Sequence, residues 1–156
     1  MTDFSMRDTT EADLPALFEI QTDADGQLMA AFTDTSNDRE KYLRKWRELL
    51  ADESVRPKVI VVDGEVIGSV GSFVLDGDTE VTYWIRRDFW GRGIATKALA
   101  ALLGKVPVRP VFARAAHDNA GSIRVLERNG FVPVGEEESF AEARQAEIRE
   151  VIFRLG

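Results

Sequence analysis

The sequence predicts a mixed α/β fold in which a mostly antiparallel sheet is flanked by helices, in the order β-α-α-β-β-β-α-β-α-β-β. Two Asp-Gly pairs in the middle of the chain separate apolar runs of strand length, which is the pattern of consecutive β-hairpins. Segments with apolar residues at helical spacing lie on both sides of these hairpins. The length of 156 residues is that of one domain, 1–156, and 44% hydrophobic with 30% charged residues is typical of a folded protein.

The first third of the chain is predicted to contain a strand, a helix, a polar connection and a second helix: Phe4–Arg7, Thr10–Gln21, Gln21–Asn37 and Asp38–Leu50. Thr10 and Asp13 are three residues apart, as in a capping box that opens a helix. In the second helix Tyr42, Trp46 and Leu49 follow helical spacing, which favours a role in core packing. The connection between the helices is expected to be a loop or a broken helix.

Two hairpins are predicted next, because Asp63-Gly64 and Asp76-Gly77 each separate apolar runs. The runs are Lys58–Val62, Glu65–Val70, Gly71–Leu75 and Asp78–Ile85. Aspartate and glycine tolerate the positive backbone φ of a two-residue hairpin turn. We therefore expect a three-stranded antiparallel meander.

The last third is predicted to alternate helices and strands: Gly93–Leu103, Pro110–Ala116, Ser122–Arg128, Phe131–Gly135 and Ile148–Leu155. The first of these helices is rich in alanine and leucine and carries Ile94, Ala98 and Leu102 on one face. Asn129-Gly130 is expected to end the second helix, because glycine adopts the left-handed conformation common after a helix.

Composition excludes several kinds of chemistry. The chain has no cysteine, so disulfides, thiolate metal sites and a cysteine nucleophile are ruled out. A single histidine, His117, excludes a multi-histidine metal site, and we expect no metal. Apolar runs such as Val59–Val62 are too short to cross a bilayer, and the first residues, 1–4, lack a signal-peptide pattern. We therefore expect a cytoplasmic protein with no membrane partner.

The net charge of −7 is unevenly distributed along the chain. Nine basic and three acidic residues lie between Arg86 and Arg128, so this stretch carries about +6 and the remainder about −13. A nucleic-acid binder is normally basic overall, so we expect no nucleic-acid partner. A local basic stretch instead favours a small polyanion, such as a nucleotide or a phosphorylated cofactor. The alternative is that these arginines only solvate two helices.

The segment from Tyr83 to Lys97 is predicted to run from a strand through a glycine-rich turn into a helix. The start of a helix presents unpaired backbone N–H groups and a positive dipole end. Small residues at Gly91, Gly93 and Ala95 would let a phosphate approach that backbone, or would simply serve a tight turn. The spacing is neither that of a dinucleotide fingerprint nor that of a P-loop.

These residues resemble the GNAT N-acetyltransferase superfamily. Trp90-Gly91-Arg92-Gly93-Ile94-Ala95 is similar to that family's acyl-CoA pyrophosphate loop, Q/R-x-x-G-x-G/A, although Trp90 stands where the family has Gln or Arg. The Trp-Gly-Arg-Gly form, followed by Ala-Thr, resembles the branch of ribosomal-protein-alanine N-acetyltransferases. A second block, from Asn119-Ala120-Gly121-Ser122 to Gly130-Phe131, resembles the family's N-x-x-S/A…G-F segment.

The resemblance implies acetyl-CoA as the donor and assigns roles to several residues. The backbone of Trp84, Ile85 and Arg86 would pair with the pantetheine arm, and Asn119 would bond that arm near the thioester. The loop that would hold the pyrophosphate comprises Gly91, Arg92, Gly93, Ile94, Ala95, Thr96 and Lys97. Arg92, Lys97 and Arg128 are candidates for the adenosine 3′-phosphate, or are solvated surface charges.

The family's reaction is direct attack of an amine on the thioester, which suits a chain without a cysteine nucleophile. Glu80 is the candidate base, directly or through a water, unless it is a solvated strand residue. The family's tyrosine acid corresponds here to Leu126, so either Ser122 donates the proton or no acid is needed. We expect His117 to be a turn residue rather than a catalytic one.

The amine acceptor is expected between the 21–37 connection and the last two strands. Asp34, Asp38 and Glu136–Glu138 make that region acidic, which favours a cationic amine. The sequence predicts an N-acetyltransferase acting on a protein N-terminus or a small-molecule amine. The rival interpretations are a non-catalytic acyl-CoA-binding module and a nucleotide-binding regulator, and a homodimer is left open.

Overall fold

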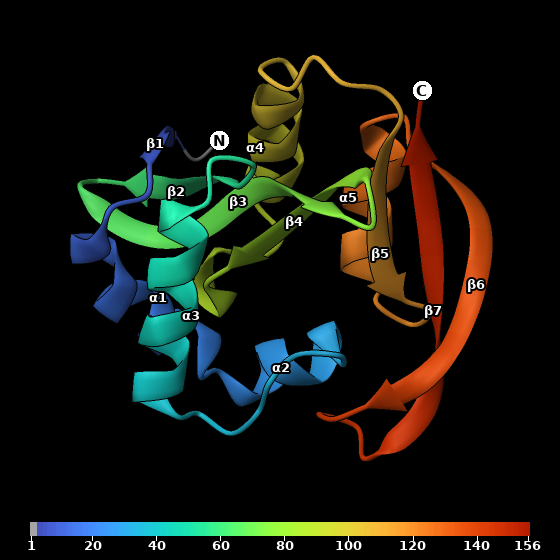
Figure 1. Ribbon diagram of the computed structural model, residues 1–156, viewed down its shortest axis with the longest axis horizontal. Coiled ribbons are helices and arrows are strands. Elements are labelled where there is room, and N and C mark those ends of the chain that lie inside the picture. Colours follow the sequence, from blue (N-terminus) through green and yellow to red (C-terminus); the bar gives the residue numbers. More distant parts are fainter. Residues whose placement is uncertain (1–2) are drawn as a thin grey trace.

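A twisted seven-stranded sheet forms the centre of the molecule (Figure 1). The computed structural model describes residues 3–156, so residues 1 and 2 of the segment that lacks a signal-peptide pattern lie outside the described residues. The strand order is β1-β2-β3-β4-β5-β7-β6, and the β4–β5 pair alone among the described strand pairs is parallel. The strands are β1 Ser5–Asp8, β2 Arg56–Val62, β3 Glu65–Leu75, β4 Asp78–Ile85, β5 Val111–Ala116, β6 Val132–Ala141 and β7 Ala146–Leu155. The predicted mixed, mostly antiparallel sheet is confirmed.

Helices cover both faces of this sheet. They are α1 Leu14–Gln21, α2 Ala24–Ala30, α3 Arg39–Ala51, α4 Ile94–Leu103 and α5 Ala120–Arg128, with short 3₁₀ turns at Glu11–Asp13 and Arg87–Phe89. The larger core cluster joins Leu99 of α4 and Leu126 of α5 to one face of β2 through Ile60. A smaller cluster joins Leu17 of α1 to the opposite face of β2 through Val59. Figure 1 accordingly shows α1 and α3 at the left and α2 at the lower centre of the view, away from α4 at the top.

Both predicted hairpin turns are confirmed. Asp63 and Gly64 have φ values of 50° and 78°, and Asp76 and Gly77 have values of 51° and 84°. All four residues therefore occupy the left-handed region that a two-residue turn requires. The apolar runs that meet at Val70 and Gly71 are one continuous strand, β3.

The 21–37 connection follows the broken-helix alternative, because it contains the helix α2, whose first turn is capped by the Asp23 side chain accepting from the Gly26 N–H. One part of the chain differs from the sequence prediction. The closing hairpin is longer than expected, because β6 continues to Ala141 and β7 begins at Ala146. Most of β6 is exposed at the sheet edge, so its sequence lacks the alternation of apolar residues by which a half-buried strand is recognised.

Strands β4 and β5 separate soon after they meet. Register pairs link only Thr79 with Val111 and Glu80 with Phe112, although β4 continues to Ile85 and β5 to Ala116. Beyond Glu80 the two strands therefore enclose a gap in the middle of the sheet. This gap determines where the candidate site lies.

Candidate active site

The gap exposes one backbone edge of β4. The Arg86 N–H donates to the Ile67 carbonyl of β3 at 2.8 Å. Antiparallel ladders alternate between paired and unpaired residues, so Trp84 also bonds toward β3, whereas Tyr83 and Ile85 present their backbone to the gap. The Trp90 indole N–H donates to the Ile85 carbonyl at 2.8 Å, which leaves the Ile85 N–H facing the gap. Of the three residues predicted to pair with a ligand arm, Ile85 faces the gap, whereas Trp84 and Arg86 bond toward β3; Tyr83, which was not predicted, also faces the gap.

The side chains of Trp84 and Arg86 make contacts outside the gap. The Arg86 guanidinium binds Glu65 at 2.6 Å and Asp88 at 2.7 Å, and these carboxylates raise its pKa. The Trp84 ring packs against α2, where a Cβ placed on Gly26 would lie only 3.1 Å from the ring. Glycine at position 26 therefore allows α2 to approach β4 closely.

Helix α4 begins at the end of β4 with an open amino terminus. Gly93 is its N-cap in the left-handed conformation, with φ of 75°, and it provides no side-chain cap. Gly91 has a φ of 77°, and a Cβ on either glycine would meet no atom within 4 Å. The N–H groups of the first turn, at 94–96, have no partner inside the helix, and that turn carries no acidic residue. The loop therefore has the backbone arrangement of an anion cradle, and the binding of a phosphate there stays a prediction.

The charged residues of the loop contribute differently from the prediction. The Lys97 backbone N–H donates to the Gly93 carbonyl at 3.2 Å, so it belongs to the helix ladder and not to the cradle. Arg92 is exposed and stacks over the Phe89 ring, 4.8 Å from the ring centroid. Arg128 is exposed in the last turn of α5. The side chains of Arg92, Lys97 and Arg128 are all exposed, so both predicted roles, phosphate ligand and solvated charge, stay open for each.

A cavity of about 970 Å³ lies between the sheet and helices α1 and α3. It brings together five residues from β4 and α5: Glu80, Tyr83, Trp84, Asn119 and Ser122. The glycine-rich loop at 91–97 does not line it. The predicted catalytic residues thus share one cavity, and the anion cradle lies outside it.

Glu80 is buried where β4 and β5 begin to separate. Only 7% of the residue is exposed, and it lies between β3 and β5, so it is not the solvated strand residue of the alternative interpretation. Its carboxylate lies 3.6 Å from the Arg114 guanidinium. Burial raises the pKa of Glu80, Arg114 opposes the rise, and the nearby Glu150 carboxylate adds to it. Glu80 is therefore a carboxylate with more than the usual affinity for a proton, as a general base requires.

Asn119 holds the start of α5. Its Oδ1 accepts from the Ser122 N–H at 3.2 Å, and its Nδ2 donates to the Met29 carbonyl at 3.2 Å. The side chain therefore ties α5 to α2 and retains one N–H and one lone pair for a ligand. Leu126, on the next turn, has no exposed surface and lies in the core.

Ser122 contacts Tyr83, a residue that was not predicted to belong to the site. Its Oγ lies 2.7 Å from the Tyr83 phenolic oxygen, across the gap between β4 and α5. Burial raises the pKa of Tyr83 to about 12, although the bond to Ser122 lowers it in part. Tyr83 could have been found from the alternation along β4 only if the position of α5 had been known.

The acidic wall of the cavity differs in part from the prediction. Asp34 and Asp38 line the cavity as expected, whereas Glu136–Glu138 do not, and Glu142 and Glu150 take their place. Hydrogen bonds from Ser36 and from Lys41, whose ammonium lies 2.9 Å away, lower the pKa of Asp34 to about 2. The sequence misassigned the glutamates because it placed the end of β6 too early.

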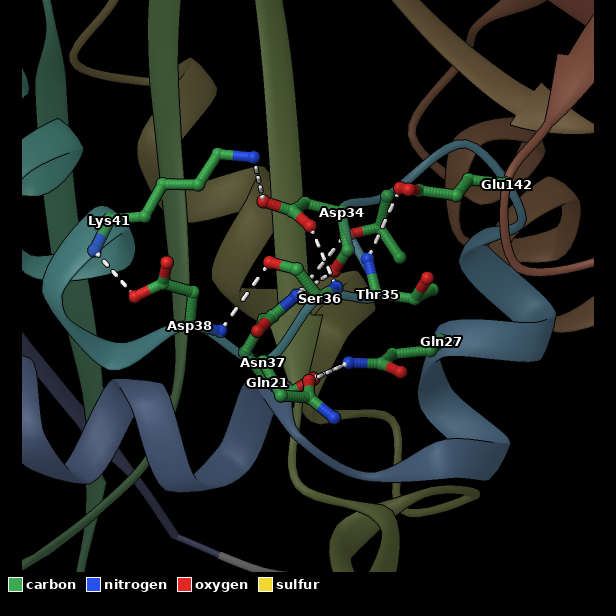
Figure 2. Close-up of polar contacts among 10 residues, drawn as sticks. Gln21, Gln27, Asp34, Thr35, Ser36, Asn37, Asp38, Lys41 and Glu142 are labelled. Atoms are coloured by element: carbon green, nitrogen blue, oxygen red, sulfur yellow. Dashed lines mark hydrogen bonds and ion pairs between the residues drawn. The ribbon is translucent and has the colours of Figure 1, made fainter.

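The α2–α3 loop is held across the cavity mouth by its own polar contacts (Figure 2). The Gln27 Nε2 donates to Asn37 at 2.8 Å, and the Thr35 N–H donates to Glu142 of the β6–β7 turn at 3.2 Å. Arg144, in the same turn, donates two hydrogen bonds to the Asp118 carboxylate, at 2.8 and 2.9 Å. The loop and the turn together form one fixed rim of the cavity.

The remaining predictions concern residues outside this constellation. His117 is exposed, and its backbone N–H donates to the Arg149 carbonyl at 3.0 Å, just after the end of β5. Within residues 3–156 there is no group of three or more side chains able to hold a metal. None of the described helices is long and apolar enough to cross a membrane.

Comparison with known proteins yields one family and several relatives. A family model described as an acetyltransferase (GNAT) domain matches residues 4–132. YdaF of Bacillus subtilis (strain 168), provisionally named a ribosomal N-acetyltransferase, is 32% identical over 104 residues. That match covers 62% of this chain and 57% of YdaF, so it spans little more than half of the relative.

Solved structures share the fold over nearly the whole chain. The ribosomal-protein-alanine N-acetyltransferase from Brucella melitensis has a TM-score of 0.82 and 24% identity, with 97% of this chain and 98% of that chain covered. The spermidine N-acetyltransferase from Vibrio cholerae, solved with CoA and spermine, has a TM-score of 0.81 and 17% identity, with 97% of this chain and 95% of that chain covered. These likenesses confirm the predicted fold.

Proposed function

The chain belongs to the acetyltransferase (GNAT) domain family, and we propose that it moves the acetyl group of acetyl-CoA onto a primary amine by direct attack on the thioester. The observation that carries this proposal is the position of Glu80. It is a buried carboxylate of raised pKa at the point where β4 and β5 part, in one cavity with Ser122 and Asn119. An amine in that cavity would lie between a base and any thioester held in the gap.

The donor would follow the gap from the cavity to the start of α4. The N–H groups of Ile94, Ala95 and Thr96 would hold the pyrophosphate, because they are unpaired and lie at the positive end of the helix dipole. The Tyr83 and Ile85 backbone would bond the pantetheine amides in place of a missing strand neighbour. Arg92, Lys97 and Arg128 have exposed side chains and are the candidates for the remaining phosphate.

Glu80 would take the proton that the amine must lose. At pH 7, deprotonating an α-amine of pKa about 7.7–8.0 costs about 1 kcal/mol, whereas a lysine-like amine of pKa about 10.4 costs roughly 4.6 kcal/mol. A base is therefore needed most for amines of high pKa. The departing thiolate, of pKa about 8.5, is a tolerable leaving group without an acid.

The acceptor would be a cationic amine. Five carboxylates line the cavity, and three basic side chains oppose them: Asp34, Asp38, Glu80, Glu142 and Glu150 against Lys41, Lys45 and Arg114. YdaF is named for a ribosomal acceptor and the Vibrio cholerae enzyme, which shares the fold, for spermidine, so a protein N-terminus and a polyamine are the acceptor classes to test first. Both acceptor classes would satisfy the charge of the cavity.

The test is CoA thiol release from acetyl-CoA in the presence of free-N-terminal peptides, polyamines or no acceptor. We expect release above the no-acceptor rate with at least one amine class, and mass spectrometry should find that amine acetylated. Calorimetry with CoA is run in parallel. Tight CoA binding without turnover for any amine would support the non-catalytic module instead, an alternative that rests on Leu126 standing where the family has its tyrosine acid.

A further inference from the structure

Two hydroxyl groups meet across the gap in the sheet. Tyr83 reaches from β4 to Ser122 in the first turn of α5, and the two side-chain oxygens are 2.7 Å apart. The same phenolic oxygen lies 3.0 Å from the Ser122 carbonyl. Both residues line the cavity that contains Glu80. The pair therefore joins β4 to α5 across the gap, with Tyr83 reaching from β4 and Ser122 from α5.

The two distances allow two arrangements of the protons. In one, the phenol donates to the Ser122 carbonyl at 3.0 Å and the serine hydroxyl donates to the phenolic oxygen at 2.7 Å. In the other, the phenol donates to the Ser122 Oγ, at the distance most usual for an O–H···O bond. When Tyr83 donates to Oγ, the serine proton is free to point into the cavity.

We propose that Tyr83 is a positioning residue for Ser122, and that it directs the serine O–H toward the sulfur of bound CoA. A donor that itself accepts a hydrogen bond becomes a stronger donor. A preorganised donor stabilises negative charge as it develops on a leaving atom. This inference rests on the proposed function for its catalytic consequence, but it requires only that CoA occupies the gap.

The atoms of the step balance without a protein acid. The amine lone pair forms the C–N bond, the C–S bond breaks, and its electron pair goes to sulfur. The amine proton goes to Glu80 and from there to water. The thiolate, held by the Ser122 O–H, takes a proton from water as CoA leaves. Because burial raises the pKa of Tyr83 to about 12, its phenol stays protonated and is not consumed.

The first test needs no acceptor. The ultraviolet absorbance of the thiolate is followed during a pH titration of CoA bound to the wild type, Tyr83→Phe and Ser122→Ala. We expect the bound thiol to ionise about 10-fold more readily in the wild type than in either variant, as one hydrogen bond to a charged group permits. Equal thiol pKa values in all three proteins would overturn the inference even if acetyl transfer is found.

The second test uses acetyl transfer with the best acceptor. Tyr83→Phe and Ser122→Ala should each lower kcat by about 10- to 100-fold with the Kd for CoA unchanged. If Tyr83 acts only through Ser122, the double variant should lose no more than Ser122→Ala alone, and Ser122→Thr should retain sensitivity to Tyr83→Phe. Multiplied losses in the double variant would contradict the inference.

The chain contains its own matched control for a lost phenol. It has two tyrosines, and Tyr42 packs against Phe18 and Trp46 on the other wall of the cavity. Tyr42→Phe combined with Ser122→Ala should give the product of the two single effects, because these residues are not in contact. A wild type without any turnover would refute the proposed function, while the thiol titration would still decide the role of Tyr83.

Discussion

Arg114 lies 3.6 Å from Glu80, on the strand that leaves β4 at that point, and its guanidinium also binds Glu137 and Glu150. One cation thus faces three carboxylates from three strands. Burial and Glu150 raise the pKa of Glu80, and Arg114 limits the rise. The protonation of the candidate base is therefore determined by a balance that one substitution can disturb.

We predict that Arg114→Gln moves the acid limb of the pH–activity profile to higher pH. Acetyl transfer requires ionised Glu80, so activity should rise as the pH passes its raised pKa. Removing Arg114 takes away the stabilising charge and leaves Glu150 unneutralised, and both changes raise that pKa further. Arg149→Gln, which removes an exposed partner of Glu136, is the control and should leave the limb in place. An unmoved limb in Arg114→Gln would show that Glu80 does not govern the profile.

Glu80→Gln should lower kcat/KM by roughly 10²–10⁴, the range for a positioned general base. The loss should shrink as the pH approaches the acceptor pKa, because solvent then supplies neutral amine. The Kd for CoA should not change. Nearly full activity of this variant at pH 7 would mean that the site binds amines that are already neutral.

Gly93→Val should weaken CoA binding well over tenfold in calorimetry. The new side chain would project into the open space above the first turn of α4, where we place the pyrophosphate. Gly77→Val is the matched control, because Gly77 also has a positive φ, 84° against 75°, and open space around it. Both variants should lose stability through backbone strain, but only the first should lose affinity. Equal affinities of Gly93→Val and Gly77→Val for CoA would refute the proposed position of the pyrophosphate.

Asp13→Asn should destabilise the fold by roughly 2 kcal/mol at pH 7. Asp13 is 5% exposed, and two bonds of 2.7 Å from Arg7 lower its pKa to about 2 from 3.8. The depressed pKa stabilises the folded state above pH 4, and this contribution disappears as the pH falls toward 2. Urea unfolding at several pH values between 2 and 4 should show that the free energy of unfolding of the wild type falls with pH, and that this fall is much smaller in Asp13→Asn and in Arg7→Met. The same fall in both variants as in the wild type would contradict the assignment.

Local patterns explain which parts of the fold were predictable. The turns at Asp63-Gly64 and Asp76-Gly77 and the loop at Gly91–Gly93 depend on backbone conformations that few residue types adopt, so they can be recognised in isolation. The exposed edge strand β6 could not be delimited, because neither of its faces is buried enough to impose a pattern. A broken helix was one of two alternatives for the stretch that contains α2, and its polar composition left the bounds of that helix open, although Asp23 is a good N-cap.

The sequence by itself determined the family resemblance, the anion cradle at the start of α4 and the choice of Glu80 as a candidate base. Only the tertiary structure decided that Glu80 is buried beside Arg114 and that Tyr83 meets Ser122. The cradle is made by consecutive residues, whose conformation follows from local preferences. The other two features join residues 34 and 39 positions apart in the chain, and they exist because β4 meets β5 in parallel and then leaves it. No local pattern in the sequence encodes that divergence.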